Sequence, residues 1–221
     1  MFELSISKAV ITLISIIAFL ISVSCHEFAH GYVAYKLGDP SAKLSGRLTL
    51  NPIKHFDLLS IMFFAVFHFG WAKGVPINPV NFKDRKKGMV LSALAGPLTN
   101  VLIALIAAII LQVYPKSTSA GKIVFYILLY IKQFLYYLLS VNVMLAIFNL
   151  IPIPPLDGSK IFFSVFPERT YFRILSYDRY MLIILLILIY SGGLDRLINT
   201  GAENLLNIIT MLADKIVFFG C

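Results

Sequence analysis

The stretch His26-Glu27-Phe28-Ala29-His30 carries three side chains whose spacing suits hydrolytic chemistry. On a helix, residues four apart lie on one face, so His26 and His30 can offer two imidazole nitrogens to one metal ion. Glu27 turns toward the same side, where it can take a proton from a water molecule beside the metal. The pattern predicts a zinc site with His26 and His30 as ligands and Glu27 as the catalytic acid/base.

The surroundings of this stretch are unusual for a metal site. The residues from Ala9 to Val23 are almost wholly apolar, and ionisable groups inside a membrane span are costly and mark functional sites by default. The two histidines lie past the middle of the apolar run, toward the end that carries Lys36. We therefore expect a hydrolytic site inside a bilayer, nearer the cytoplasmic face.

A hydrolytic zinc ion usually has three protein ligands and one open position. The candidates for the third ligand are His55, His68, Asp157, Glu168 and Glu203. Asp157 is favoured by charge, because Zn²⁺ and the carboxylates of Asp157 and Glu27 sum to zero in a low-dielectric site. We expect His55 and His68 to be surface or packing histidines.

The segment Asn149–Gly158 supports the choice of Asp157. Pro152, Pro154 and Pro155 remove backbone donors and forbid a continuous helix. Non-helical backbone at membrane depth is tolerated only where it is buried in protein or lines a wet cavity. We interpret the segment as a helix broken to build a site, with a loop at the membrane surface as the alternative.

The composition indicates an all-α integral membrane protein. Of 221 residues, 59% are hydrophobic and 14% are charged, against roughly 45–50% and 25% in soluble domains. The length leaves room for one polytopic membrane domain, with a catalytic core at about 7–166 and accessory helices at about 167–221. The net charge of +8 comes from Lys and Arg in short loops between apolar runs, as the positive-inside rule predicts. Nucleic acid is therefore not expected as a partner.

The sequence predicts about five to six hydrophobic helices. Full spans are expected at 7–37, 89–113 and 123–148, and further hydrophobic helices at 180–190 and 203–219. Between the first two spans, the alternating residues 41–52 predict a short strand or hairpin. The apolar run 58–69 is short for a crossing and predicts a re-entrant segment. Residues 70–82 are expected to be extended and irregular.

Two residues of the second span stand one helical turn apart. Gly96 and Asn100 give this helix a small face and an amide with which to approach another helix closely. Packing alone would also explain them.

The motifs HEFAH, AGPLTN and NLIPIPPLDG, in this order and at these distances, resemble the site-2 protease family of intramembrane zinc metalloproteases. The resemblance implies His26, His30 and Asp157 as zinc ligands, Glu27 as acid/base, Asn149 as a group that holds the substrate or its oxyanion, and Gly96 and Asn100 as residues that shape the substrate-binding site. The chain lacks room for a PDZ or CBS domain, so the compact microbial forms are the better match.

The function predicted from these residues is cleavage of a peptide bond within or near a membrane span of another protein, expected to be a single-span helix in the cell membrane. Two alternatives remain open. In one, the protein is a membrane-embedded peptidase with a cytosol-facing site and Glu168 as third ligand. In the other, it is a zinc or cation transporter, with His26, His30 and Asp157 as a transit site.

Overall fold

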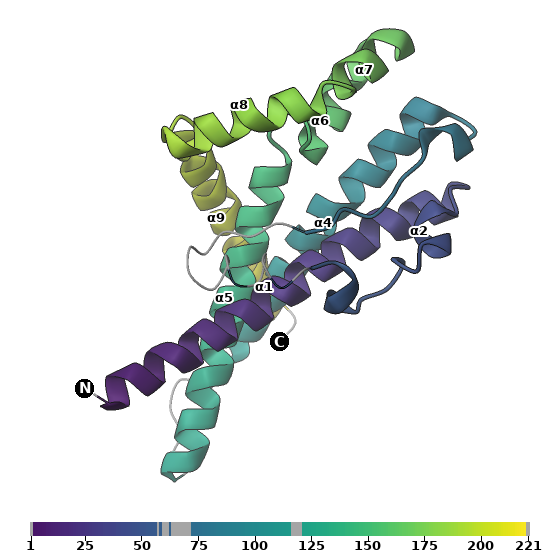
Figure 1. Cartoon of the computed structure of the whole chain (residues 1–221). Helices are drawn as coiled ribbons and strands as arrows, with labels where there is room; N and C mark the ends of the chain where they lie inside the picture. The colour runs from purple at the N-terminus through teal and green to yellow at the C-terminus, as the bar shows by residue number, and fades with distance from the viewer. Residues whose placement is uncertain (1, 57, 59–61, 63–71, 116–120, 220–221) are drawn as a thin grey trace.

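The computed structural model describes residues 2–56, 58, 62, 72–115 and 121–219 (Figure 1). All regular elements in this part of the chain are helical, and it contains no strand. In chain order they are α1 (Phe2–Lys36), α2 (Ser41–Leu44), η1 (Pro52–Lys54), η2 (Pro79–Asn81), α4 (Arg85–Val113), α5 (Lys122–Asn149), α6 (Asp157–Phe162), η3 (Phe163–Val165), α7 (Glu168–Leu175), α8 (Asp178–Tyr190) and α9 (Asp195–Phe219).

The three long helices α1, α4 and α5 confirm the three predicted full spans. Each is long and apolar enough to cross a membrane. Helix α4 begins at Arg85 and is capped by the preceding residue, Asp84, whose side chain accepts a hydrogen bond from the backbone N–H of Lys87. Helix α1 ends before Gly38, whose φ of 108° is a conformation that glycine adopts without strain. Local sequence signals therefore set both helix boundaries at this end of the molecule.

The described residues contain three candidate membrane spans, or four if α8 and α9, which meet at 82°, form one bent span. Helix α8 has only 13 residues, about 20 Å, against a hydrocarbon core of about 30 Å. The predicted segment Leu58–Phe69 lies almost wholly outside the described residues. The all-helical membrane fold is thus confirmed, and the count of five to six hydrophobic helices stays a prediction.

Helix α4 occupies the centre of the packing. It contacts α1 on one side and α5 and α9 on the other, and Figure 1 shows α9 turning back beside α5. The core between α4, α5 and α9 is built around small residues, namely Ala104, Ala107, Ala108 and Ala213, with Leu139, Val143 and Ile209 between them. Small side chains let membrane helices approach closely, which fixes α4 against its neighbours.

The predicted strand at 41–52 is wrong. Ser41–Leu44 forms the short helix α2, because the Asp39 carboxylate accepts from the backbone N–H and the hydroxyl of Ser41 at 3.1 and 2.6 Å and so favours a helical start over a strand. The prediction of irregular, extended backbone up to Phe82 is confirmed for residues 72–78, after which η2 forms.

The predicted helix break after α5 is confirmed. Residues 150–156 contain only turns and bends, and α6 starts at Asp157. Gly158 is required here, since a Cβ on it would lie 2.2 Å from the carbonyl oxygen of Leu150. The break therefore folds back on the end of α5 and turns Asp157 toward α1 and α4.

Candidate metal centre

Three ligand atoms from distant parts of the chain meet between α1, α4 and α6. The Oδ2 atom of Asp157 lies 3.2 Å from Nε2 of His26 and 3.0 Å from Nε2 of His30. The two Nε2 atoms are 2.8 Å apart. All three residues are buried, with 5% or 6% of their surface exposed. The helix periodicity in α1 and the broken backbone before α6 thus build the cluster that their sequence positions predicted.

The donor set fits a zinc ion. Zinc bonds to imidazole nitrogen and carboxylate oxygen are about 2.0–2.2 Å long, which places tetrahedral ligands about 3.3 Å apart. The three separations of 2.8, 3.0 and 3.2 Å are only slightly shorter. A small outward movement of three side chains opens the position for the ion, so the protein holds a nearly formed zinc tripod.

A fourth residue, Lys160, completes the surroundings of Asp157. Its ammonium donates to Asp157 Oδ1 at 2.8 Å, which leaves Oδ2 for the metal, and its side chain is 27% exposed. The sum of charges that favoured Asp157 as the third ligand counted Zn²⁺, Asp157 and Glu27 but not Lys160. The spacing of three residues between Asp157 and Lys160 on one helix could have indicated this ion pair.

The second nitrogen of each histidine is held by α4. His30 Nδ1 lies 2.7 Å from the carbonyl oxygen of Ser92, and His26 Nδ1 lies 2.5 Å from Oδ1 of Asn100. Both partner oxygens are hydrogen-bond acceptors, so the Nδ1 atom of each histidine carries the hydrogen. Each Nε2 atom then keeps its lone pair for a metal ion. Asn100 therefore contacts His26, a candidate metal ligand, and its predicted role in binding substrate stays a prediction.

Gly96 lies where α4 presses on both imidazoles. A Cβ built on it would meet His30 Nε2 at 2.4 Å and His26 Cε1 at 2.5 Å. Real side chains do not tolerate such approaches, so only glycine lets the helix close over the two rings. The small face predicted at Gly96 thus packs on the rings of His26 and His30.

Glu27 is half-buried and its carboxylate contacts the extended segment 72–78. Its Oε2 accepts the backbone N–H of Val75 at 2.8 Å. Gly31, one turn further along α1, makes room for this segment, because a Cβ there would lie 3.0 Å from Cγ1 of Val75. The sequence alone gave no signal that this backbone group reaches Glu27.

The remaining candidate residues stay apart from the cluster. His55 is fully buried and its Nε2 binds the carbonyl oxygen of Thr49 at 2.8 Å, as a packing histidine does. His68 lies outside the described residues. Glu168 and Glu203 are exposed. Asn149, at the end of α5, donates from Nδ2 to the carbonyl oxygen of Leu145 at 3.0 Å.

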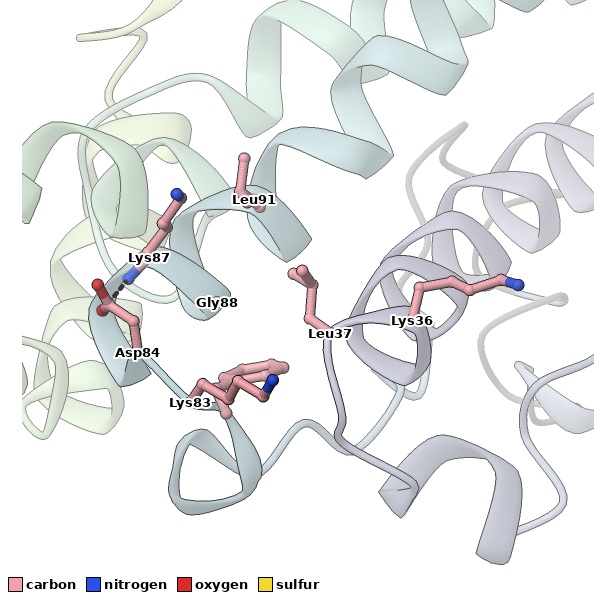
Figure 2. Close-up of a pocket in the computed structure, with 8 residues that line it drawn as sticks. Lys36, Leu37, Lys83, Asp84, Lys87, Gly88 and Leu91 are labelled. Atoms are coloured by element: carbon pink, nitrogen blue, oxygen red, sulfur yellow. Dashed lines mark hydrogen bonds between the residues drawn. The ribbon is translucent and has the colours of Figure 1, made fainter.

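Two cavities flank the helices that hold the site, and neither is lined by His26, His30 or Asp157. One, of about 380 Å³, lies between the end of α1 and the start of α4 and is lined by Lys36, Lys83 and Lys87 among others (Figure 2). The other, of about 480 Å³, is a mainly apolar groove between α1 and α4, lined by residues such as Phe28 and Leu98.

Comparison with known proteins agrees with this geometry. The family model "Peptidase family M50" matches residues 14–192. The chain is 34% identical to "Putative zinc metalloprotease YwhC" of Bacillus subtilis (strain 168), over 89% of this chain and 91% of that protein. It is 29% identical to "Putative zinc metalloprotease Rip2" of Mycolicibacterium smegmatis, over 65% of this chain and 53% of that protein. It is also 27% identical to "Zinc metalloprotease MJ0392" of Methanocaldococcus jannaschii, over 69% and 34% respectively. No solved structure matches the chain.

The family match covers the whole candidate site, from His26 to Asp157. Together with the apolar helices, it makes the protein a multi-pass membrane metalloendopeptidase that uses Zn²⁺, and the transporter alternative is set aside. The chain belongs to peptidase family M50, the site-2 protease family of zinc metalloproteases.

Proposed function

We propose that this protein cleaves peptide bonds within or near the membrane spans of other membrane proteins, with single-span proteins as its substrates. The observation that carries the proposal is the depth of the metal ligands. His26 and His30 lie inside a helix that is apolar enough to cross a membrane from Lys8 to Lys36. His30 precedes Lys36 by six residues, about 9 Å along the helix axis. A bond that reaches this site must come from within or close to the bilayer.

The zinc ligands of this site are His26, His30 and Asp157. Bound zinc supplies a Lewis acid that lowers the pKa of water and polarises the scissile carbonyl. Glu27 accepts the proton of the attacking water and delivers it to the leaving amine. The Val75 N–H holds one carboxylate oxygen of Glu27 and leaves the other for the proton.

Asn149 is proposed to bind the substrate or its oxyanion. It lies at the last residue of α5, next to the broken segment that ends at Asp157. Its amide now donates to the carbonyl oxygen of Leu145 in its own helix. A substrate carbonyl offers the same kind of acceptor, so a change of rotamer would transfer the donor to the substrate.

The active site is proposed to open toward the cytoplasm. The cations Lys36, Lys43, Arg47, Lys54, Lys83, Arg85, Lys86 and Lys87 lie at the end of α1, at the start of α4 and in the connection between them. By the positive-inside rule this end faces the cytoplasm. The two histidines of α1 lie closer to the end that carries Lys36 than to the N-terminal end of the helix. Water that enters from the Lys36 end therefore has the shorter path to the zinc site.

A membrane helix shields its own carbonyl groups, so a substrate must unwind before it is cut. The extended residues 74–78 run past Glu27, and an unwound substrate could pair with this backbone as an added strand. The segment 41–52, for which a strand or hairpin was predicted, begins with the helix α2 and is not proposed for this role.

Reconstitution in liposomes tests the proposal. Purified protein is mixed with single-span substrates, and the cut site is mapped by mass spectrometry for the active protein and for Glu27→Gln. We expect zinc-dependent cuts inside or within a few residues of the span with the active protein alone. Cuts confined to soluble loops, far from the span, would instead favour the cytosol-facing peptidase.

A further inference from the structure

A chain of buried polar side chains leads from the metal centre across three helices. Asn100 in α4 donates from Nδ2 to Oδ1 of Asn142 in α5 at 2.7 Å. Asn142 in turn donates from Nδ2 to Oγ of Ser22 in α1 at 2.7 Å. All three side chains are fully buried, at 0% exposure. Polar groups so deep in a membrane helix bundle are costly unless they have a purpose.

Two backbone carbonyl groups fix the direction of each hydrogen bond between Ser22, Asn142 and Asn100. Asn142 Nδ2 also meets the carbonyl oxygen of Leu138 at 2.7 Å, and a carbonyl can only accept. The hydroxyl of Ser22 donates to the carbonyl oxygen of Ala18 at 2.7 Å, so its oxygen is left to accept from Asn142. Asn142 can therefore present only its oxygen to Asn100.

The orientation of Asn100 decides which nitrogen of His26 holds the proton. With Nδ2 bound to Asn142, Oδ1 of Asn100 faces His26 Nδ1 and requires a hydrogen there. If the amide turned over, Nδ2 would face Nδ1 and favour the tautomer with its proton on Nε2, which cannot bind zinc. His30 has no such freedom, because its Nδ1 meets the acceptor-only carbonyl oxygen of Ser92.

From these contacts we infer that Asn142 is a positioning residue for the metal centre: with Ser22, it sets the Asn100 amide so that His26 offers Nε2 to zinc. The inference rests on the zinc site of the proposed function. Asn142 touches no metal ligand and acts only through Asn100. Such outer partners of metal ligands typically change metal affinity about 10- to 100-fold.

The test compares two substitutions of similar size in the full-length, zinc-loaded protein. Asn142→Leu removes the acceptor for Asn100 Nδ2, and we expect zinc to bind about 10-fold more weakly in competition with a chelator. Asn142→Asp keeps an oxygen toward Asn100 in either protonation state, so its zinc affinity should stay within about 3-fold of the unmodified protein. An equal loss in both variants overturns the inference.

Spectroscopy separates this role from general packing. The chain has four histidines, so ¹⁵N-histidine labelling gives few Nδ1–H signals, assigned with the help of His55→Gln and His68→Gln. In Asn142→Leu the His26 signal should move while the His30 signal stays, because Ser92 holds His30 independently. If the two signals change together, or neither changes, the inference fails.

A serine pair in α1 keeps the test decisive if Asn142→Leu does not fold. Ser15 and Ser22 are both buried, at 2% and 0%, and both donate to a carbonyl of their own helix. Ser22 alone is seen to accept from Asn142. Ser22→Ala should weaken zinc binding about 2- to 10-fold and Ser15→Ala should not. Equal effects of the two would overturn the inference. Because zinc affinity is the readout, a protein that binds zinc but cuts no membrane substrate refutes the proposed function and not this inference.

Discussion

The backbone N–H of Val75 donates to Glu27 Oε2 at 2.8 Å, across 48 residues of sequence. The same extended segment is anchored at its other end, where the backbone N–H of Asn78 donates to Oδ2 of Asp39 at 2.7 Å. Asp39 lies in the turn after α1, three residues past Lys36, and also accepts from Asn81 Nδ2 at 2.7 Å. The segment is therefore held at one end by Glu27 within α1 and at the other end by Asp39 in the turn that follows α1.

Substitution of Glu27 by Gln should leave zinc bound and stop cleavage. The three ligands His26, His30 and Asp157 remain, while the proton acceptor is lost. We expect the cleavage rate to fall at least ~100-fold, the lower range for general acid/base groups. Zinc content by metal analysis and initial rates on one substrate supply the check. Near-normal turnover by a zinc-loaded Gln variant would contradict the mechanism.

Substitution of Asp157 by Ala should lower zinc occupancy and activity together. It removes one of three ligand atoms and leaves Lys160 beside two imidazoles without its carboxylate. We expect zinc affinity to fall at least ~100-fold. His55→Ala is the control, since His55 binds Thr49 and not the cluster. Zinc retained by Asp157→Ala but lost by Glu168→Ala would assign the third ligand to Glu168.

Gly96→Ala should damage the zinc site although the change adds one methyl group. That group would come within 2.4 Å of His30 Nε2, so α4 or the two rings must move. We expect zinc affinity to fall about 10-fold or more, comparable to the loss of a partner of a metal ligand. Gly121→Ala is a suitable control, because nothing lies within 4 Å of a Cβ at that position. Equal zinc contents in the two variants would show that α4 can shift freely.

Much of the site could be predicted from the sequence, because its signals are local. The spacing of His26 and His30 places them on one helix face, and the three prolines before Asp157 predict a broken helix. The contacts made by Val75, Lys160 and Asn142 were missed. Asn142 could have been noticed as a polar residue within an apolar span, whereas the approach of Val75 depends on tertiary folding that no periodicity encodes. The strand at 41–52 was wrong because hydrogen bonds to Asp39 outweigh the alternation of side chains.

Acid should loosen the segment 74–81 through Asp39. Burial raises the pKa of Asp39, but donors on Ser41, Asn81 and Asn78 lower it more, so the net pKa is depressed. A depressed pKa means that the carboxylate contributes stability above its ordinary pKa of about 3.9 and loses it as pH falls through the lower folded-state value.

Asp39→Ala should therefore lower the melting temperature at pH 7, because the free energy of unfolding falls by about 2 kcal/mol. The difference in melting temperature between the variant and the unmodified protein should become smaller below about pH 3.9. Thermal unfolding in detergent across this range measures it. A gap that does not change with pH would mean that the charge of Asp39 adds nothing to stability.

Substrates with helix-breaking residues at the cut site should be cleaved faster. Gly and Pro make it easier to open a helix by roughly 1 to 3 kcal/mol each relative to Ala, and the carbonyl must leave its helix to reach zinc. Leu or Ala in their place should slow the reaction. Cleavage rates across a substrate series, with membrane insertion checked for each member, test this. Rates indifferent to helix propensity would show that unwinding does not limit cleavage.

The three residues that could hold a metal ion come from α1 and α6, and the last of them along the chain is Asp157. During synthesis from the N-terminus, His26 and His30 enter the membrane long before Asp157 leaves the ribosome. The growing chain then holds the two imidazoles without the carboxylate that completes the cluster. The order of these residues along the chain means that the cluster can form only after α4, α5 and the broken segment have been made.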